Sequence, residues 1–146
     1  MMKSKTTGQS SSLRALNKAI GYLNKKIPFA LQEGGNKMVA KAKSNHDFTT
    51  RSGQAERSIQ ADVVSKDWQL IFWINPDRVT SGNYNYAWGL HDGTGTGYLK
   101  SMMSPIVKPK LKSGGIKHDH FMVRAYEGEI KNLQRDIANV IKGAFR

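Results

Sequence analysis

Residues 58–75 are SIQADVVSKDWQLIFWIN, and this stretch decides the fold class because its pattern is typical of strands in a chain that has helical patterns near both ends. Two runs rich in β-branched and aromatic residues, Ser58 to Val64 and Trp68 to Asn75, are typical of strands. The three residues between them, Ser65 to Asp67, suit a short hairpin loop. The second run is apolar on both of its alternating faces, so we expect a central strand that is covered on both sides.

Helical patterns lie before and after this hairpin. Apolar residues recur at steps of three and four from Leu13 to Ile27, which indicates the apolar face of an amphipathic helix. Pro28 and then Gly34-Gly35 interrupt the pattern, so residues 38–43 are either a kinked continuation of this helix or a second short helix, and we favour a kinked pair. Near the other end of the chain, Asp119 is a candidate N-cap for a helix that continues to the C-terminus.

The order helix, strands, basic loop, helix predicts an α+β fold. We expect an antiparallel β-sheet of about 3–5 strands packed against an N-terminal amphipathic helix and a C-terminal helix. Tyr84 to Leu90 is a candidate for a further strand or a short helical turn, and Met102 to Val107 is a candidate for a short edge strand. Residues 93–118, rich in Gly and Lys, form a predicted long basic loop that becomes ordered only against a partner. The predicted organisation is a flexible arm at 1–12 and a single domain over 13–146.

Charge is the strongest functional signal in the composition. The 146 residues include 23 Lys+Arg and 11 Asp+Glu, a formal net charge of +12. The excess is concentrated in residues 1–57, with eleven basic and three acidic side chains, and in residues 99–118, with five and none. It favours binding to polyanions, either nucleic acid or an acidic protein surface. The apolar runs are short and Cys is absent, so we expect no membrane span, no secretion signal and no thiol chemistry.

Few residues favour catalysis. His-Asp occurs three times, at His46-Asp47, His91-Asp92 and His118-Asp119, and His118 with His120 suits chelation of a divalent ion from an extended segment. However, the sequence offers no neighbouring carboxylate cluster, no phosphate loop ending in Gly-Lys-Ser/Thr and no Gly-x-Ser-x-Gly elbow. We expect a protein that is not an enzyme, without catalytic, cofactor-binding or metal-binding residues. A metal-dependent hydrolase remains a hypothesis that a metal titration tests.

The basic loop is the best candidate for a functional surface. Its lysines have no acidic counterpart, and it holds one aromatic residue that suits stacking on a base. We expect it to contact an acidic protein surface; the less favoured alternatives are contact with DNA and a solvated run of charge without a partner. The candidate interface residues in this loop are Tyr98, Lys100, Lys108, Lys110, Lys112 and Lys117.

Three segments of the chain carry a further pattern. Residues 52–59, SGQAERSI, are close to Thr-Gly-x-Leu-x-x-Ser-Ile at the entry to a strand. Residues 86–94, YAWGLHDGT, are close to Tyr-Ala-x-x-Val-Glu-x-Gly-Thr, with His91 at the Glu position. Residues 120–125, HFMVRA, are close to Pro-Phe-Met-x-x-Ala at the start of a last helix. In this order, over residues 13–146, they resemble the tail-component family of long-tailed bacteriophages, the tail-completion or head–tail joining proteins of the neck.

The resemblance implies a structural virion protein without catalysis, acting as a homo-oligomeric ring, commonly a hexamer, at the head–tail junction. The implied partners are the head-side connector or stopper protein, the tail terminator or tail tube protein, and the genomic DNA that passes through the lumen. The implied location is the virion, and the host cytoplasm during assembly. His91 joins the candidate interface because it replaces the Glu of the second motif. The alternative, from composition, is a small basic nucleic-acid-binding protein.

Overall fold

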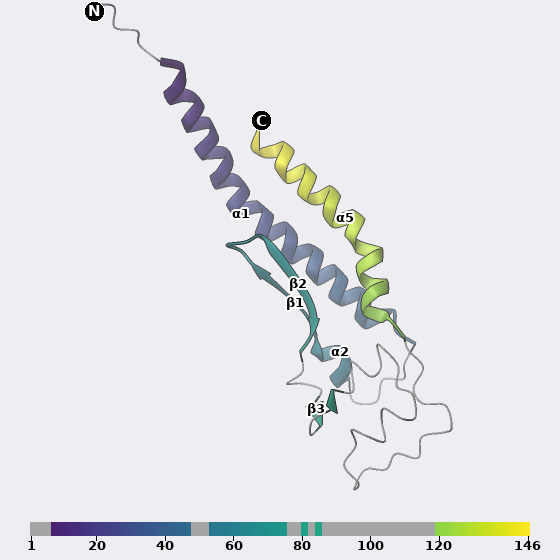
Figure 1. Cartoon of the computed structure of the whole chain (residues 1–146). Coiled ribbons are helices and arrows are strands. Elements are labelled where there is room, and N and C mark those ends of the chain that lie inside the picture. The colour runs from purple at the N-terminus through teal and green to yellow at the C-terminus, as the bar shows by residue number, and fades with distance from the viewer. Residues whose placement is uncertain (1–6, 48–52, 76–79, 82–83, 86–118) are drawn as a thin grey trace, which may run out of the picture.

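The computed structural model describes residues 7–47, 53–75, 80–81, 84–85 and 119–146. The fold is α+β, as predicted, with a long N-terminal helix, a two-stranded antiparallel sheet and a C-terminal helix (Figure 1). Within the described residues the strands pair as two separate two-stranded sheets, β1 with β2 and β3 with β4, so a single sheet of 3–5 strands is not established. The elements are α1 (Thr7–Ser44), α2 (Gln54–Ser58), β1 (Ile59–Val64), β2 (Gln69–Ile74), β3 (Thr80–Ser81), β4 (Tyr84–Asn85) and α5 (Phe121–Ala144).

Helix α1 is the element on which the others pack. The β1–β2 hairpin lies along its C-terminal half, and α5 runs antiparallel to it (Figure 1). The C-terminal end of α1 is level with the start of α5, because Arg124 Nη2 donates a hydrogen bond to the carbonyl of Asn45. Since α1 has 38 residues and α5 has 24, α1 extends about 14 residues, or about 20 Å, past the end of α5. We call this projecting segment, residues 7–20, the α1 overhang.

The predicted interruption of the first helix is wrong, because α1 is one helix that contains Pro28. A proline inside a helix removes one backbone hydrogen bond. Here the adjacent turn is held by packing, since Ile27 and Leu31 on either side of Pro28 are buried in the core. The helix also begins at Thr7, so residues 7–12 of the predicted arm are helical, whereas residues 1–6 lie outside the described part of the chain.

The two glycines that suggested a helix end are instead points of close approach. A Cβ on Gly34 would lie 2.6 Å from Cδ1 of Leu133 in α5, and a Cβ on Gly35 would lie 2.7 Å from Cδ1 of Leu70 in β2. Neither distance is compatible with an unshifted side chain. The glycines therefore let α5 and the hairpin approach adjacent sides of α1, at some cost in helix propensity.

The hairpin is confirmed, with Ile59 opposite Ile74 and Val64 opposite Gln69. Its turn includes Trp68, which has a positive φ of 51° and is therefore outside the strand that was predicted to begin there. Ile74 is buried, but Ile71 on the other face is 39% exposed. The expected cover on both faces of this strand is thus missing in the described residues, where one face packs on α1 and the other is open.

A short helix was missed ahead of the first strand. The predicted strand begins at Ser58, whereas Ser58 is the last residue of α2 and is fully buried. Its hydroxyl donates a hydrogen bond of 2.6 Å to the carbonyl of Ala55, which satisfies the buried group locally. Gly53 precedes α2 in the left-handed region, with φ 68°, a conformation that glycine adopts without strain.

Helix α5 is confirmed, but its predicted N-cap is wrong. The residue at the N-cap is His120, in a left-handed conformation and without a side-chain cap hydrogen bond. Asp119 is buried and its carboxylate instead accepts a hydrogen bond from the backbone N–H of Asp47 and pairs with Arg124. A tertiary contact has therefore replaced the local cap.

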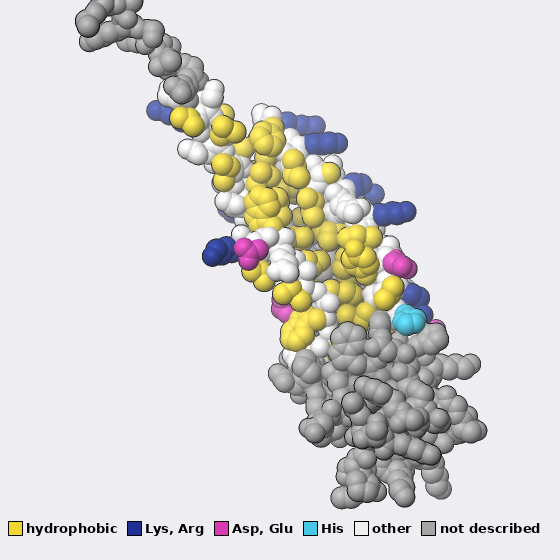
Figure 2. Space-filling model, in the orientation of Figure 1, with side chains coloured by type: hydrophobic (Ala, Val, Ile, Leu, Met, Phe, Trp, Pro, Cys, Tyr) yellow, Lys and Arg dark blue, Asp and Glu magenta, His cyan; other side chains and the backbone are white. Residues whose placement is uncertain are grey.

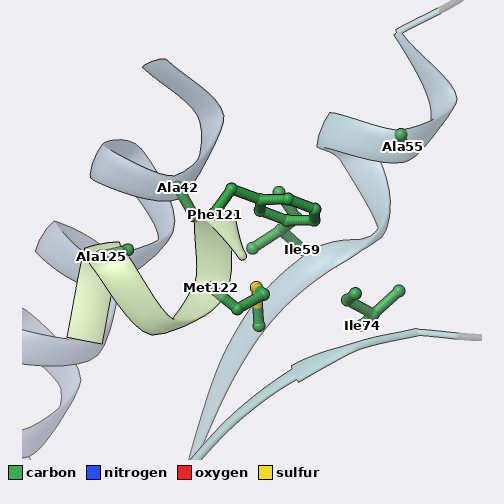
Figure 3. Packing of buried hydrophobic residues seen from close by; sticks show 7 residues of the cluster. All are labelled: Ala42, Ala55, Ile59, Ile74, Phe121, Met122 and Ala125. Carbon is green, nitrogen blue, oxygen red and sulfur yellow. The ribbon is translucent and has the colours of Figure 1, made fainter. Parts of the chain in front are cut away.

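Two apolar clusters form the core. The lower cluster joins the end of α1, the α2–β1 segment, β2 and the start of α5 (Figure 3). Its buried members are Ala42, Ala55, Ile59, Ile74, Phe121, Met122 and Ala125. The upper cluster lies between α1 and α5 beneath the hairpin, and its buried members are Ile27, Leu31, Met38 and Leu133. Phe72 of β2 packs against both clusters, so the core is continuous along α1.

Candidate functional site

The residues predicted to form the interface lie outside the described part of the chain. They belong to residues 86–118, as does the second of the three family-like segments. The structure therefore neither brings these residues together nor separates them, and their role stays a prediction. The residues concerned are His91, Tyr98, Lys100, Lys108, Lys110, Lys112 and Lys117.

The structure describes both residues of His46-Asp47 and only Asp119 of His118-Asp119, and their polar groups pair with other residues. His46 Nε2 lies 3.3 Å from Oε1 of Glu56, which links the end of α1 to α2. Asp47 donates its backbone N–H to Oδ2 of Asp119 at 2.6 Å. Within the described residues no group of three or more His, Asp or Glu side chains is arranged to hold a metal ion. The His118 and His120 hypothesis gains nothing here, because His118 is not among those residues.

Arg124 is the centre of this contact between the two helices. Its Nη2 pairs with Oδ1 of Asp119, donates to the carbonyl of Asn45 at 2.8 Å and lies 3.7 Å from Oδ2 of Asp47. The Asp119 side chain is almost completely buried, so its charge needs this partner. The sequence shows Arg124 inside the last family-like segment but does not indicate that it binds residues nearly eighty positions earlier.

A second polar contact joins the helices one turn further along. Lys41 Nζ lies 3.0 Å from Oε1 of Glu129 and also donates to the carbonyl of Gly128 at 3.3 Å. Hydrogen bonds from Asn132 and Lys41 to the Glu129 carboxylate lower its pKa below the ordinary value of 4.5. These groups position α5 on α1, and nothing in their geometry offers a nucleophile or a general base to a substrate.

Several large apolar side chains are exposed on the described surface, and one group of them lies on the α1 overhang. Leu13, Leu16 and Ile20 are 57%, 51% and 53% exposed, although they continue the same face of α1 that is buried further down at Ile27 and Leu31. The sequence predicts this whole face as core, because the repeat does not show where α5 ends. Figure 2 shows hydrophobic side chains continuing over the upper part of the two helices, with Lys and Arg toward the outline of this face.

Comparison with known proteins gives no relative for this chain. It matches no protein-family model, no curated protein and no solved structure. A search of the helices in the described residues finds none with the length and apolarity that crossing a membrane requires.

Proposed function

We propose that this protein is a structural component of a bacteriophage neck, a tail-completion protein that joins the head connector to the tail as an oligomeric ring without catalysis. The observation that carries the proposal is the meeting of the first and last family-like segments in one core. Ile59 of the first segment and Phe121 and Ala125 of the last belong to the same buried cluster, some sixty residues apart in sequence (Figure 3).

Most motif positions in the described residues have a structural use, the exception being His120, whose φ of 50° is one that the Pro of the motif could not adopt. Gly53 takes the left-handed conformation at the start of α2, and Ser58 and Ile59 are buried at the entry to β1. Phe121 is completely buried at the start of α5. Such positions suit a scaffold that presents surfaces to partners, which is the activity expected of a joining protein.

The sharpest test removes the gene from the genome that encodes it. We expect DNA-filled heads and separate complete tails in electron micrographs of the lysate, and restoration of joined particles when the protein is supplied in trans. Joined, infectious particles in the absence of the protein would contradict the proposal.

The alternative is a small nucleic-acid-binding protein, which the cationic side of α1 favours. Arg14, Lys18 and Lys25 are exposed on α1, away from the apolar face. A binder of this kind should retain duplex DNA in a salt-dependent manner as a monomer or dimer. Fluorescence anisotropy with a labelled duplex, at 50 mM and 200 mM salt, separates the two functions: tight binding without any effect of gene loss on head–tail joining selects the alternative.

A further inference from the structure

The α1 overhang carries the end of a coiled-coil seam. Along α1, apolar or small residues alternate at steps of three and four without a break, at Leu13, Leu16, Ile20, Leu23, Ile27, Ala30 and Gly34. This is the a/d pattern of a heptad repeat, in which one helix packs along another. Its C-terminal part is covered by α5, whose Leu133 packs into the space at Gly34. Its first three positions have no helix against them in the described structure, because α5 ends at Ala144.

We propose that the α1 overhang pairs with the α1 overhang of a second copy of this chain, antiparallel and about a two-fold axis. The overhang of the second copy then takes the place along the seam that α5 occupies lower down. An antiparallel helix on this seam is the packing that α1 already makes with α5 (Figure 1). The contact is isologous, so Leu13 and Leu16 of one copy lie against Leu16 and Leu13 of the other.

The charge pattern favours a second copy over other occupants. The protein is strongly basic, so a contact between two copies must at least avoid placing like charges side by side. The exposed positions that flank the seam are uncharged, namely Ser12, Asn17 and Asn24, while Ala19 is already buried. An acidic helix would find no cation beside the seam to pair with.

An anionic lipid surface fits the overhang less well because of where its cations lie around the helix. Successive residues in a helix are about 100° apart, so the two cations of the overhang, Arg14 and Lys18, lie about 120° and about 160° around α1 from Ile20. A helix that lies on a membrane needs its cations close to the border of its apolar face. The apolar and cationic surfaces of the overhang are instead back to back.

The size of the contact predicts a reversible dimer. Beyond the three seam residues, Ile141 and Phe145 at the end of α5 are 43% and 67% exposed, next to where the second overhang would lie. About two heptads of seam make a short coiled coil. We therefore expect the sedimentation coefficient to increase with concentration, from that of one 16.3 kDa chain toward that of two.

Sedimentation velocity of the full chain tests the proposal, with a matched control on the same helix. Leu16→Ser removes a seam residue that is 51% exposed, and Phe29→Ser removes an apolar residue that is 62% exposed on the opposite side of α1. We expect Leu16→Ser to weaken dimerisation at least tenfold and Phe29→Ser to leave it unchanged, while circular dichroism shows the same helix content for both. A monomer at every concentration, or dimerisation that Leu16→Ser does not weaken, overturns the proposal.

Disulfide trapping tests the orientation, because the chain has no cysteine of its own. Leu13→Cys and Leu16→Cys proteins, mixed and oxidised, should form the mixed dimer in preference to either homodimer. Homodimers of Leu16→Cys in excess would mean parallel helices and overturn the two-fold arrangement. The proposal does not rest on the neck function, since it concerns the isolated protein. A third outcome is that no dimer forms in solution and that the protein binds vesicles of anionic lipid, with Leu16→Ser abolishing the binding. This outcome would overturn the proposal and identify a membrane as the partner of the overhang.

Discussion

Gly21 and Gly35 are in the same helix but in opposite surroundings. A Cβ at Gly21 would meet nothing within 4 Å, whereas a Cβ at Gly35 would lie 2.7 Å from Cδ1 of Leu70 and 2.8 Å from Cβ of Ala61. Alanine gains helix propensity equally at both sites, so any difference between the two substitutions reports on packing alone.

We therefore expect Gly21→Ala to raise the free energy of unfolding by about 0.5–1 kcal/mol. Gly35→Ala should lower it by about 1–3 kcal/mol, because the hairpin must move away from α1 to admit the methyl group. Urea denaturation followed by circular dichroism measures both. Equal stabilisation by the two substitutions would show that the hairpin does not lie against Gly35.

Glu129 makes stability depend on pH in the acid range. Its pKa is lowered in the folded protein by hydrogen bonds from Asn132 and Lys41, so the folded state favours the charged form. The contribution of this carboxylate is complete above its ordinary pKa of 4.5 and is lost as the pH falls through the lowered folded value. Glu129→Gln should therefore lower the free energy of unfolding at pH 7. Below the lowered pKa of Glu129 in the folded protein, the variant and the wild type should be equally stable.

Thermal melts of the wild type and Glu129→Gln between pH 7 and pH 3 test this sign. Glu127→Gln is the matched control, because Glu127 is exposed two residues earlier on α5. The interpretation is wrong if the gap between the wild type and Glu129→Gln widens as the pH falls.

Between elements, the α1–α5 contact is the main apolar interface of the described fold. Leu133 of α5 is 5% exposed within the upper cluster, and Leu23 of α1 packs against the same cluster. A charge placed in such an interface costs several kcal/mol, which is comparable with the whole stability of a domain of this size. Leu133→Asp and Leu23→Asp should both prevent soluble folding.

Expression and soluble yield measure this, with Phe29→Asp as the control. Phe29 is on α1 as well but is 62% exposed, so Asp should be tolerated there. Soluble Leu133→Asp protein that melts like the wild type would place α5 elsewhere.

The elements themselves could largely be predicted from the sequence, because their apolar periods are local. The hairpin and α5 follow from residues 58–75 and from the pattern after Asp119. The continuity of α1 could not be predicted, since Pro28 and Gly34-Gly35 end helices unless a neighbour holds them, and Leu133 is a hundred residues away. The roles of Arg124 and of the α1 overhang depend on where α5 begins and ends relative to α1, which a single-helix pattern does not contain.

For the whole molecule, the net charge of +12 attracts anionic partners before any contact forms. Lys108, Lys110 and Lys112 lie outside the described residues, and we predict that they contact an acidic surface of the neck or the DNA in its channel. Their replacement by Ser should leave the fold intact and reduce head–tail joining, because it removes the positive charges that bind an anionic surface. Such contacts act only at short range, since salt screens them over about 8 Å at physiological ionic strength.

Counting joined particles, tailless heads and loose tails in micrographs measures the effect. The control removes the same number of cations from α1, as Arg14→Gln, Lys18→Gln and Lys25→Gln. A normal yield of virions from the Ser variant, or equal losses from both triple variants, would show that the segment has no specific role.

The packing of α5, the last helix of the chain, on α1, the first helix, has a consequence for synthesis. A ribosome completes α1 at Ser44 and finishes α5 only at Ala144, a hundred residues later. At about 5–20 residues per second, the nascent chain carries the buried side of α1 without its helical cover for about 5–20 seconds. The hairpin emerges earlier in that interval and covers the side of α1 at Gly35. The side at Gly34, which Leu133 covers in the folded protein, stays exposed until α5 has been synthesised. Chaperones that bind apolar helices should therefore meet this protein on the ribosome, and a pause in translation ahead of α5 should increase aggregation.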